Sequence, residues 1–314
     1  MKLQTKIPLE KRSNNLINYK SNIVLLGSCF SENIAKKLDY FKFQNLQNPF
    51  GILFHPRAIE TLISNAVINK EYSEEEVFFH NEQWHCFDAH SKLSNALKEN
   101  LIQALNSKLS LTSAVIQNST HIIITLGTAW VYRDVKTNSI VANCHKVPQK
   151  QFKKELLSVE DITNSLKNIL SLIRRVNNNA FVVFTVSPIR HTKDGFVENT
   201  QSKAHLITAI HKVISNQSFY FPSYEILMDE LRDYRFYKDD MIHPNQLAIN
   251  YIWEKFKTVW ISDASFRTMD EVDTIQKGLQ HKPFNSKSQA HQEFLQKLEA
   301  KKNQLHVQFP HIVF

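Results

Sequence analysis

Three short segments of the sequence are apolar almost throughout, and they constrain the fold more than any other feature. They are NIVLL at residues 22–26, HIIITLG at residues 121–127 and AFVVFTV at residues 180–186. Strands have this composition when helices cover both faces of their sheet, as in parallel sheets. Helical patterns alternate with these strands along the chain. The sequence therefore predicts an α/β fold with a parallel sheet as its middle layer.

Helices are predicted where apolar residues recur every three or four positions. The strongest pattern covers residues 91–109, and the others cover residues 31–38, 55–67, 159–175, 199–214, 223–231 and 243–260. Further short strands are predicted at residues 41–45 and 218–222. Residues 72–90 show no clear period, and residues 129–150 are expected to be irregular.

The composition changes beyond residue 262. Residues 288–305 predict a lone amphipathic helix, with Phe294, Leu298 and Leu305 on its apolar side. This helix can pack on the main domain or on a partner, and we expect it to dock on the main domain. The chain is therefore divided into a main domain at residues 1–262 and a helical extension at residues 263–314.

Composition and charge narrow the class of protein. The chain has 314 residues, of which 42% are hydrophobic and 22% charged, as in globular proteins. Its net charge of +8 comes from dispersed basic residues without a patch, which predicts a solvated surface and no nucleic-acid partner. No apolar stretch is long enough for a membrane span, and the N-terminus lacks the apolar core of a signal peptide. Three scattered cysteines predict a reduced, cytoplasmic protein.

The chain contains five glycines where an average chain of this length has about 22. A sequence so poor in glycine is expected to keep one where the backbone needs a positive φ or a close approach. Gly27 and Gly127 end two of the predicted strands, and Gly51 ends the turn NPFG. These three positions therefore mark turns that the fold requires.

Polar side chains follow the predicted strands at the points where ligands bind in open parallel sheets. Ser28 and Cys29 follow the first strand, and Ser187 to His191 follow the strand at residues 180–186. A serine at a strand-to-helix turn lies beside backbone N–H groups and the positive end of a helix dipole. Such a serine becomes a nucleophile only when a base is near.

The segment DDMIHPN, just before the last helix of the main domain, supplies that base. His243 can accept the serine proton, and Asp240 can orient its ring and stabilise the charged form. Asp239 competes for the same role, but the spacing favours Asp240. Backbone groups around Gly51 and Thr128 are the expected further donors to an oxyanion.

The segments GSCF, NPFG, LGTAW, NCHK, SPIRH and DxxHP occur in this order, and together they resemble the GSCFA family over about residues 3 to 260. That family is similar to SGNH hydrolases, which are esterases, lipases and acyltransferases. The resemblance implies a three-layer α/β/α flavodoxin-like fold and makes the main domain catalytic. It implies Ser28 as nucleophile, with Asp240 and His243 as acid and base. It also implies an oxyanion hole formed by Ser28, Gly51 and a third residue.

The third residue of the oxyanion hole departs from the family pattern. The usual glycine-x-asparagine is Gly127-Thr128-Ala129 here, so the asparagine is missing. Thr128 or a loop residue such as Asn143 replaces it, or the hole is weaker. Ser31 stands where the family name has alanine, which should not affect the chemistry.

Each candidate residue also has a structural interpretation. Ser28 can cap a helix, since serine is a preferred N-cap residue. Cys29 is a second candidate nucleophile, because a thiolate at a helix N-terminus is activated. A substrate-binding role for Asn143 and His145 competes with a loop held by its own hydrogen bonds. Cysteines and histidines near residues 85–90 and 144–145 match no standard zinc spacing, so no metal is predicted.

Arg190 and His191 follow a strand end, and Arg190 can clamp a carboxylate or phosphate of the substrate or pair with a local acid. The predicted function is a serine hydrolase that acts on an ester, such as an O-acyl or O-acetyl group of a carbohydrate or small molecule, without a cofactor. Two alternatives remain. One is O-acyl transfer by the same residues, and the other is a non-catalytic binding protein on a degenerate hydrolase scaffold.

Overall fold

A five-stranded parallel sheet forms the centre of the computed structural model, which describes residues 5–314. Its strands lie in the order β10 (Ser218–Phe221), β9 (Phe181–Val186), β5 (His121–Leu126), β1 (Ile23–Gly27) and β2 (Asn45–Gln47). Counted along the chain, this is the flavodoxin-like order 2-1-3-4-5, whose switch point lies between β1 and β5. The predicted fold class is confirmed.

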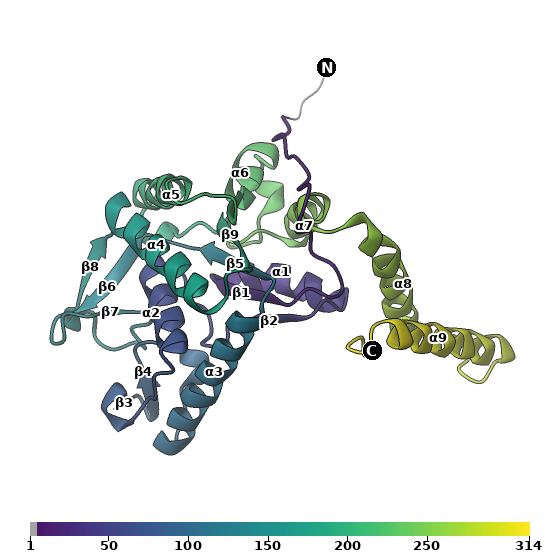
Figure 1. Cartoon of the computed structure of the whole chain (residues 1–314), viewed down its shortest axis with the longest axis horizontal. Coiled ribbons are helices and arrows are strands. Elements are labelled where there is room, and N and C mark those ends of the chain that lie inside the picture. Colours follow the sequence, from purple (N-terminus) through teal and green to yellow (C-terminus); the bar gives the residue numbers. More distant parts are fainter. Residues whose placement is uncertain (1–4) are drawn as a thin grey trace.

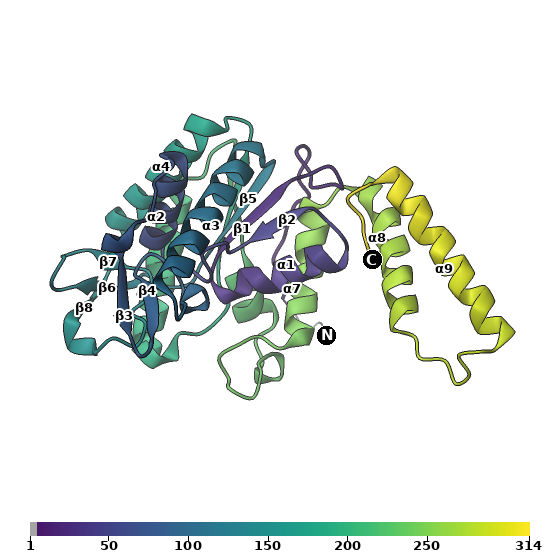
Figure 2. The same cartoon turned by 90° about the horizontal axis from the view of Figure 1, so that it is seen from below.

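Helices cover both faces of the sheet, as Figures 1 and 2 show. One face packs on α2 (Pro56–Val67), α3 (Lys98–Asn118), α4 (Val159–Val176) and α5 (Phe196–His211). The other face packs on α1 (Cys29–Tyr40), α7 (Gln246–Trp260) and the segment of α6 (Ser223–Glu225), which continues as a π-helix to Glu230. Successive residues of β1 point to opposite layers, so Val24 and Leu26 lie in one core and Ile23 and Leu25 in the other.

Several predicted element bounds were wrong. The helix predicted at residues 91–109 is continuous only from Lys98, where α3 begins. Residues 91–93 form a separate 3-10 turn, and the leucine spacing then runs through a loop in which Leu97 is exposed. The short strand β2 starts at Asn45 rather than at residue 41, because the chain first turns at Lys42 with a φ of 61°. The helix predicted at residues 243–260 is α7, which begins at Gln246 after its N-cap Asn245, so Pro244 lies outside it.

Two small antiparallel sheets lie outside the main sheet. The aperiodic residues 72–90 contain the hairpin of β3 (Val77–His80) and β4 (Gln83–Cys86). The segment 129–150, predicted to be irregular, contains β6 (Trp130–Asp134) and β7 (Ile140–Val141), and β8 (Phe152–Leu156) pairs with β6. The hairpin turn uses Asn81 and Glu82 at positive φ, without the glycine that usually signals such a turn.

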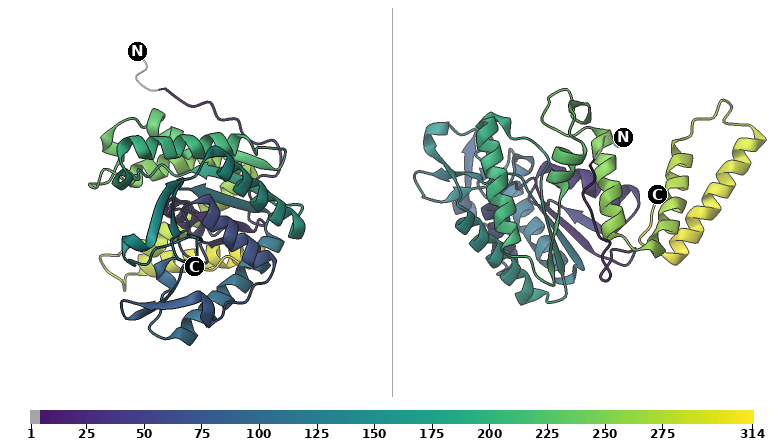
Figure 3. Two further views of the ribbon diagram at one scale, coloured as in Figure 1. Left: turned by 90° about the vertical axis from the view of Figure 1, so that its left-hand side faces the viewer. Right: turned by 90° about the horizontal axis from the view of Figure 1, so that it is seen from above.

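The C-terminal extension is a helical hairpin that projects from the end of α7 (Figures 1 and 3). The predicted lone helix is α9 (Gln289–Gln308), and it packs on the unpredicted helix α8 (Asp263–Gln280). Tyr40 of α1 donates a hydrogen bond of 2.8 Å to Asp273 of α8, which ties the hairpin to the sheet domain. Among the described residues, no helix is long and apolar enough to cross a bilayer.

The proposed boundary at residue 262 falls between the end of α7 and the start of α8. The first four residues of the predicted main domain lie outside the described part of the chain.

Candidate active site

The Ser28 turn lies at the switch point of the sheet. Gly27 ends β1 with a φ of 131°, and a Cβ on it would lie 2.1 Å from the carbonyl oxygen of Thr125 in β5. Only glycine fits this turn. Ser28 follows as the N-cap of α1, and its Oγ accepts a hydrogen bond of 3.3 Å from the Phe30 amide. The capping role is thus present, and the side chain is 1% exposed.

Asp240 and His243 form a pair on the loop before α7. His243 Nδ1 lies 2.7 Å from Asp240 Oδ2, and Asp240 Oδ1 accepts the amides of Ile242 and His243 at 2.9 Å each. The His243 amide, the Ile242 amide and the His243 side chain lower the pKa of Asp240 to about 2. The carboxylate is therefore ionised at neutral pH and holds Nδ1 protonated, which leaves Nε2 free to accept a proton.

This loop is attached to the segment that follows β9. The Arg190 amide donates to the Ile242 carbonyl at 3.2 Å, and Arg190 Nη1 donates to the Met241 carbonyl at 3.3 Å. His191 is the next residue. Burial, then the charges of Lys203 and His243, lower the pKa of His191 to about 3, and its Nε2 is buried without a partner among the described residues.

One residue of this loop is linked electrostatically to the Ser28 turn. The charge of Lys238 opposes the burial that raises the pKa of Cys29, and the Lys238 amide donates to the His243 carbonyl at 2.8 Å. No hydrogen bond joins Ser28 to His243 within the described residues. Catalytic hydrogen bonds are often long before substrate binds, so this separation alone does not remove His243 as the base.

The three predicted oxyanion donors already have partners. The amides of Ser28, Gly51 and Thr128 donate to the carbonyls of Thr125, Asn48 and Phe54, at 3.0, 2.8 and 3.1 Å. The Thr128 hydroxyl lies 3.0 Å from Ser202 Oγ and accepts the Trp130 amide. The structure therefore does not present these groups as free donors, and their oxyanion role stays a prediction. The Cys29 amide, the first of α1, donates to no backbone carbonyl among the described residues.

The Cys29 thiol is disfavoured as a nucleophile. Burial, followed by the charge of Glu32, raises the pKa of Cys29, although Lys203 and Lys238 oppose the shift. A raised pKa lowers the fraction of reactive thiolate. The hydroxyl of Ser28 therefore remains the better candidate.

The loop at residues 143–146 is held by its own hydrogen bonds. His145 is buried, its Nε2 lies 2.8 Å from the Cys86 carbonyl oxygen, and its Nδ1 lies 3.1 Å from Ser91 Oγ. Asn143 Oδ1 accepts the His145 amide at 2.8 Å. Burial lowers the pKa of His145 to about 4. These contacts favour the structural interpretation of His145, while Asn143 also lines an apolar cavity of about 330 Å³ with Phe54 and Cys144.

Aromatic rings surround Arg190 beside the loop that carries Asp240. Its guanidinium is 5.4 to 5.7 Å from the ring centres of Phe196, Tyr237 and Tyr234. It lines two neighbouring cavities of about 460 and 490 Å³, the second of which Asp240 also lines. Arg190 forms no ion pair with a carboxylate among the described residues, so it can receive an anionic group of a ligand.

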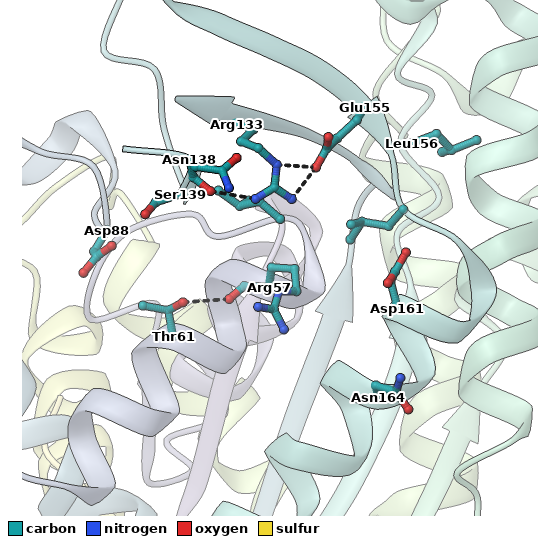
Figure 4. Close-up of a pocket in the computed structure, with 12 residues that line it drawn as sticks. Arg57, Thr61, Asp88, Arg133, Asn138, Ser139, Glu155, Leu156, Asp161 and Asn164 are labelled. Carbon is teal, nitrogen blue, oxygen red and sulfur yellow. Dashed lines mark hydrogen bonds and ion pairs between the residues drawn. The ribbon is translucent and has the colours of Figure 1, made fainter. Parts of the chain in front are cut away.

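A larger cavity lies elsewhere, between α2, α4 and the β6–β8 sheet (Figure 4). It has a volume of about 800 Å³, and Arg133 forms a 2.6 Å ion pair with Glu155 on its wall. None of the predicted site residues lines it. We still place the candidate site at the switch point of the sheet. In the large cavity, both arginines are already paired with acids.

One buried residue near the site was not predicted from the sequence. Lys203 lies on the buried face of α5 in line with Leu206 and Ile210. A lysine at an apolar position of an amphipathic helix was the signal that could have revealed it.

The structure thus defines a three-layer α/β protein with a serine at the end of its first strand and an aspartate–histidine pair before α7. A model of the GSCFA family matches residues 22–256, and a model of the C-terminal domain of GSCFA proteins matches residues 272–314. The chain belongs to the GSCFA family. No curated protein matches it significantly.

Proposed function

We propose that the protein is a serine hydrolase of SGNH type that cleaves an ester through an acyl-enzyme. The observation that supports this most is the 2.7 Å contact between His243 and Asp240 on the loop before α7, where the charge of Lys238 acts on the Cys29 thiol next to Ser28. The two ring nitrogens of His243 then have separate roles, because Asp240 holds Nδ1 and Nε2 remains free for the serine proton.

In the proposed reaction, Ser28 Oγ attacks the ester carbonyl while His243 Nε2 takes the hydroxyl proton. His243 then returns that proton to the alcohol as the ester C–O bond breaks. Water, deprotonated by His243, hydrolyses the acyl-enzyme and restores Ser28. The Cys29 amide and the dipole of α1 support the developing oxyanion.

The substrate is proposed to be a small-molecule or carbohydrate ester that carries an anionic group. Within the described part of the chain, the Arg190 guanidinium beside Asp240 pairs with no carboxylate, and the buried His191 Nε2 has no hydrogen-bond partner. The basic side chains of the chain are dispersed, so a nucleic-acid partner is not proposed. The three cysteines are free thiols, which is consistent with a proposed site of action in the reducing cytoplasm.

O-acyl transfer is a second candidate function, and the burial of Ser28 favours it. The side chain is 1% exposed, and a site that excludes water protects an acyl-enzyme from hydrolysis. A sugar hydroxyl would then replace water in the second step. Formation of product only when an acceptor alcohol is added identifies this case.

Hydrolysis of short-chain p-nitrophenyl esters tests the proposal. Ser28→Ala and His243→Ala should lose at least about 10³-fold in kcat, while Cys29→Ala should stay near the wild-type rate. Ser158→Ala is the matched control for Ser28→Ala, because it removes an N-cap of α4 without touching the site. If Ser28→Ala keeps full activity, the nucleophile is assigned wrongly. If the folded wild type shows neither hydrolysis nor acceptor-dependent product formation, a non-catalytic binding protein is the better interpretation.

A further inference from the structure

Lys203 is a buried cation without an acidic partner. Its side chain is 1% exposed, and its Nζ donates to the carbonyls of Gly127 at 2.6 Å and Ser187 at 2.8 Å. These carbonyls lie just beyond the ends of β5 and β9, so the ammonium bridges two neighbouring strands. No carboxylate pairs with it among the described residues.

Packing alone does not explain a lysine at this position. Leu206 and Ile210 occupy the same face of α5 and are fully buried, so an apolar side chain would continue that face. Burying an ammonium ion without a counter-charge is strongly unfavourable. The cation therefore needs a role that an apolar residue could not perform.

The position of Lys203 relative to Ser28 suggests that role. A Cβ on Gly127 would lie 3.3 Å from Ser28 Cβ, so Ser28 packs directly on the residue whose carbonyl binds Lys203. Burial raises the pKa of Cys29, the residue after Ser28, and the charge of Lys203 opposes that shift. Lys203 thus lies beneath the point where a charged intermediate would form.

The groups that face Lys203 from neighbouring elements are neutral or cationic. They are Cys29 of α1, His191 after β9 and the Tyr224 ring of α6, whose centre is 5.7 Å from Nζ. His243 acts electrostatically on His191 and adds no negative charge. The field of a protonated Lys203 is therefore not cancelled by an acid in direct contact with it.

We propose that Lys203, as an ammonium ion, is a positioning residue that stabilises the negative charge formed beside Ser28 during acyl transfer. The amides expected to perform this task bond to carbonyls instead. Lys203 holds the Gly127 and Ser187 carbonyls, which would otherwise repel an oxyanion, and adds a positive charge in a site closed to water. This inference rests on the proposed function of Ser28.

The proposed role of Lys203 should depend on pH, because only the protonated amine carries a charge. Burial lowers the pKa of Lys203 to about 7, so the protonated fraction falls as the pH rises above 7. The unfolded chain keeps a lysine pKa near 10.4. Because the unfolded state then binds more protons, folding stability should rise between about pH 7 and pH 10 through this residue.

The test is the rate of phosphonylation of the full-length protein by a fluorophosphonate. Ser28 Oγ attacks phosphorus, the P–F bond breaks, fluoride leaves and His243 takes the serine proton. The rate constant kinact and the binding constant KI are measured from pH 5.5 to 9.5. The variants are Lys203→Met and, as a matched control, Lys212→Met, which removes an exposed lysine just beyond α5.

Lys203→Met should lower kinact by about 10²-fold with little change in KI, and the fall of kinact above pH 7 should disappear. Lys212→Met should match the wild type. The inference about Lys203 is wrong if Lys203→Met reacts at the wild-type rate, or if the kinact of the wild type keeps rising to pH 9.5. Either result leaves the proposed role of Ser28 intact. Absence of labelling in the folded wild type overturns the proposed function and this inference with it.

Thermal unfolding provides a readout that needs no activity. The wild-type Tm, relative to that of Lys203→Met, should rise between pH 7 and pH 10. If Lys203→Met does not fold, the comparison is made with Lys203→Gln. An identical pH dependence of Tm in the wild type and the variant contradicts a buried, titrating Lys203.

Discussion

At the scale of single residues, the Asp240–His243 pair is the most defined part of the site. Asp240 accepts two amides and one imidazole, so its geometry is fixed by the loop that carries it. The i, i+3 spacing predicted Asp240 as the partner in preference to Asp239, and the structure brings Asp240 and His243 together. Their catalytic role remains a proposal.

Asp240→Asn should lower kcat/KM for ester hydrolysis by about 10³–10⁴-fold. Asparagine carries no charge to stabilise the imidazolium, and it no longer fixes the tautomer of His243. Steady-state kinetics with p-nitrophenyl esters measure the effect, and Asp239→Asn is the neighbouring control. Equal activity of the wild type and Asp240→Asn would remove Asp240 from the mechanism.

Asp240 should also contribute a pH-dependent part of the stability. Its folded pKa of about 2 lies below the unfolded value of about 3.9. The contribution is therefore present above about pH 4 and is lost as the pH falls through 2. The difference in Tm between the wild type and Asp240→Asn should shrink over this range. A difference that is constant from pH 6 to pH 2 would contradict the lowered pKa.

The residues near Ser28 show where sequence patterns stop being informative. Ser28 and the Asp240–His243 pair occur in short ordered motifs, so the strand end and the i, i+3 spacing were enough to single them out. The hydrogen bonds of the Gly51 and Thr128 amides depend on the exact backbone conformation of their turns. The spacing of residues in the sequence does not determine that conformation. Lys203 was missed because a single lysine in a helix is usually exposed.

At the scale of secondary structure, the strand ends position the chemistry. β1, β5 and β9 are neighbours, so Ser28, Gly127 and Ser187 meet at one edge. These three strands are buried on both faces, so their segments are apolar almost throughout and could be recognised in the sequence. The β3–β4 hairpin was not recognised, because its histidines and aromatic residues do not alternate with a period of two and its turn has no glycine.

Gly27→Ala should destabilise the protein severely, by about 4 kcal/mol or more. A methyl group would meet the Thr125 carbonyl oxygen at 2.1 Å in a backbone conformation that alanine rarely adopts. Urea denaturation measures the loss. Gly278→Ala is the comparison, because a methyl group there meets only the flexible ends of Leu298 and Phe294. Similar stability of the two variants would contradict the close approach of β1 and β5.

At the scale of the whole molecule, the chain combines a sheet domain with a helical hairpin. The amphipathic pattern of α9 was recognised, but α8 was not, so the hairpin appeared as a lone helix. The packing of α8 on α1 through the bond between Asp273 and Tyr40 joins the two parts. Contacts between segments more than 200 residues apart are not visible in a local pattern.

Leu298→Ala should destabilise the hairpin by about 2–5 kcal/mol. Leu298 is 4% exposed and packs over Gly278 between α8 and α9. Hydrogen exchange should become faster in α9, while the exchange of β1 and β5 and the esterase rate stay unchanged. Leu295→Ala, at a position that is 41% exposed in the same helix, should have little effect. Equal exchange rates in both variants would refute the packing of α9 on α8.

One measurement tests directly whether Ser28 is the nucleophile, as we propose. The protein is incubated with a fluorophosphonate, and the modified residue is located by mass spectrometry of its peptides. We expect one phosphonyl group on Ser28, absent in Ser28→Ala, strongly reduced in His243→Ala and retained in Cys29→Ala. Modification at Cys29 or at another serine, or no modification of the folded protein, would contradict it.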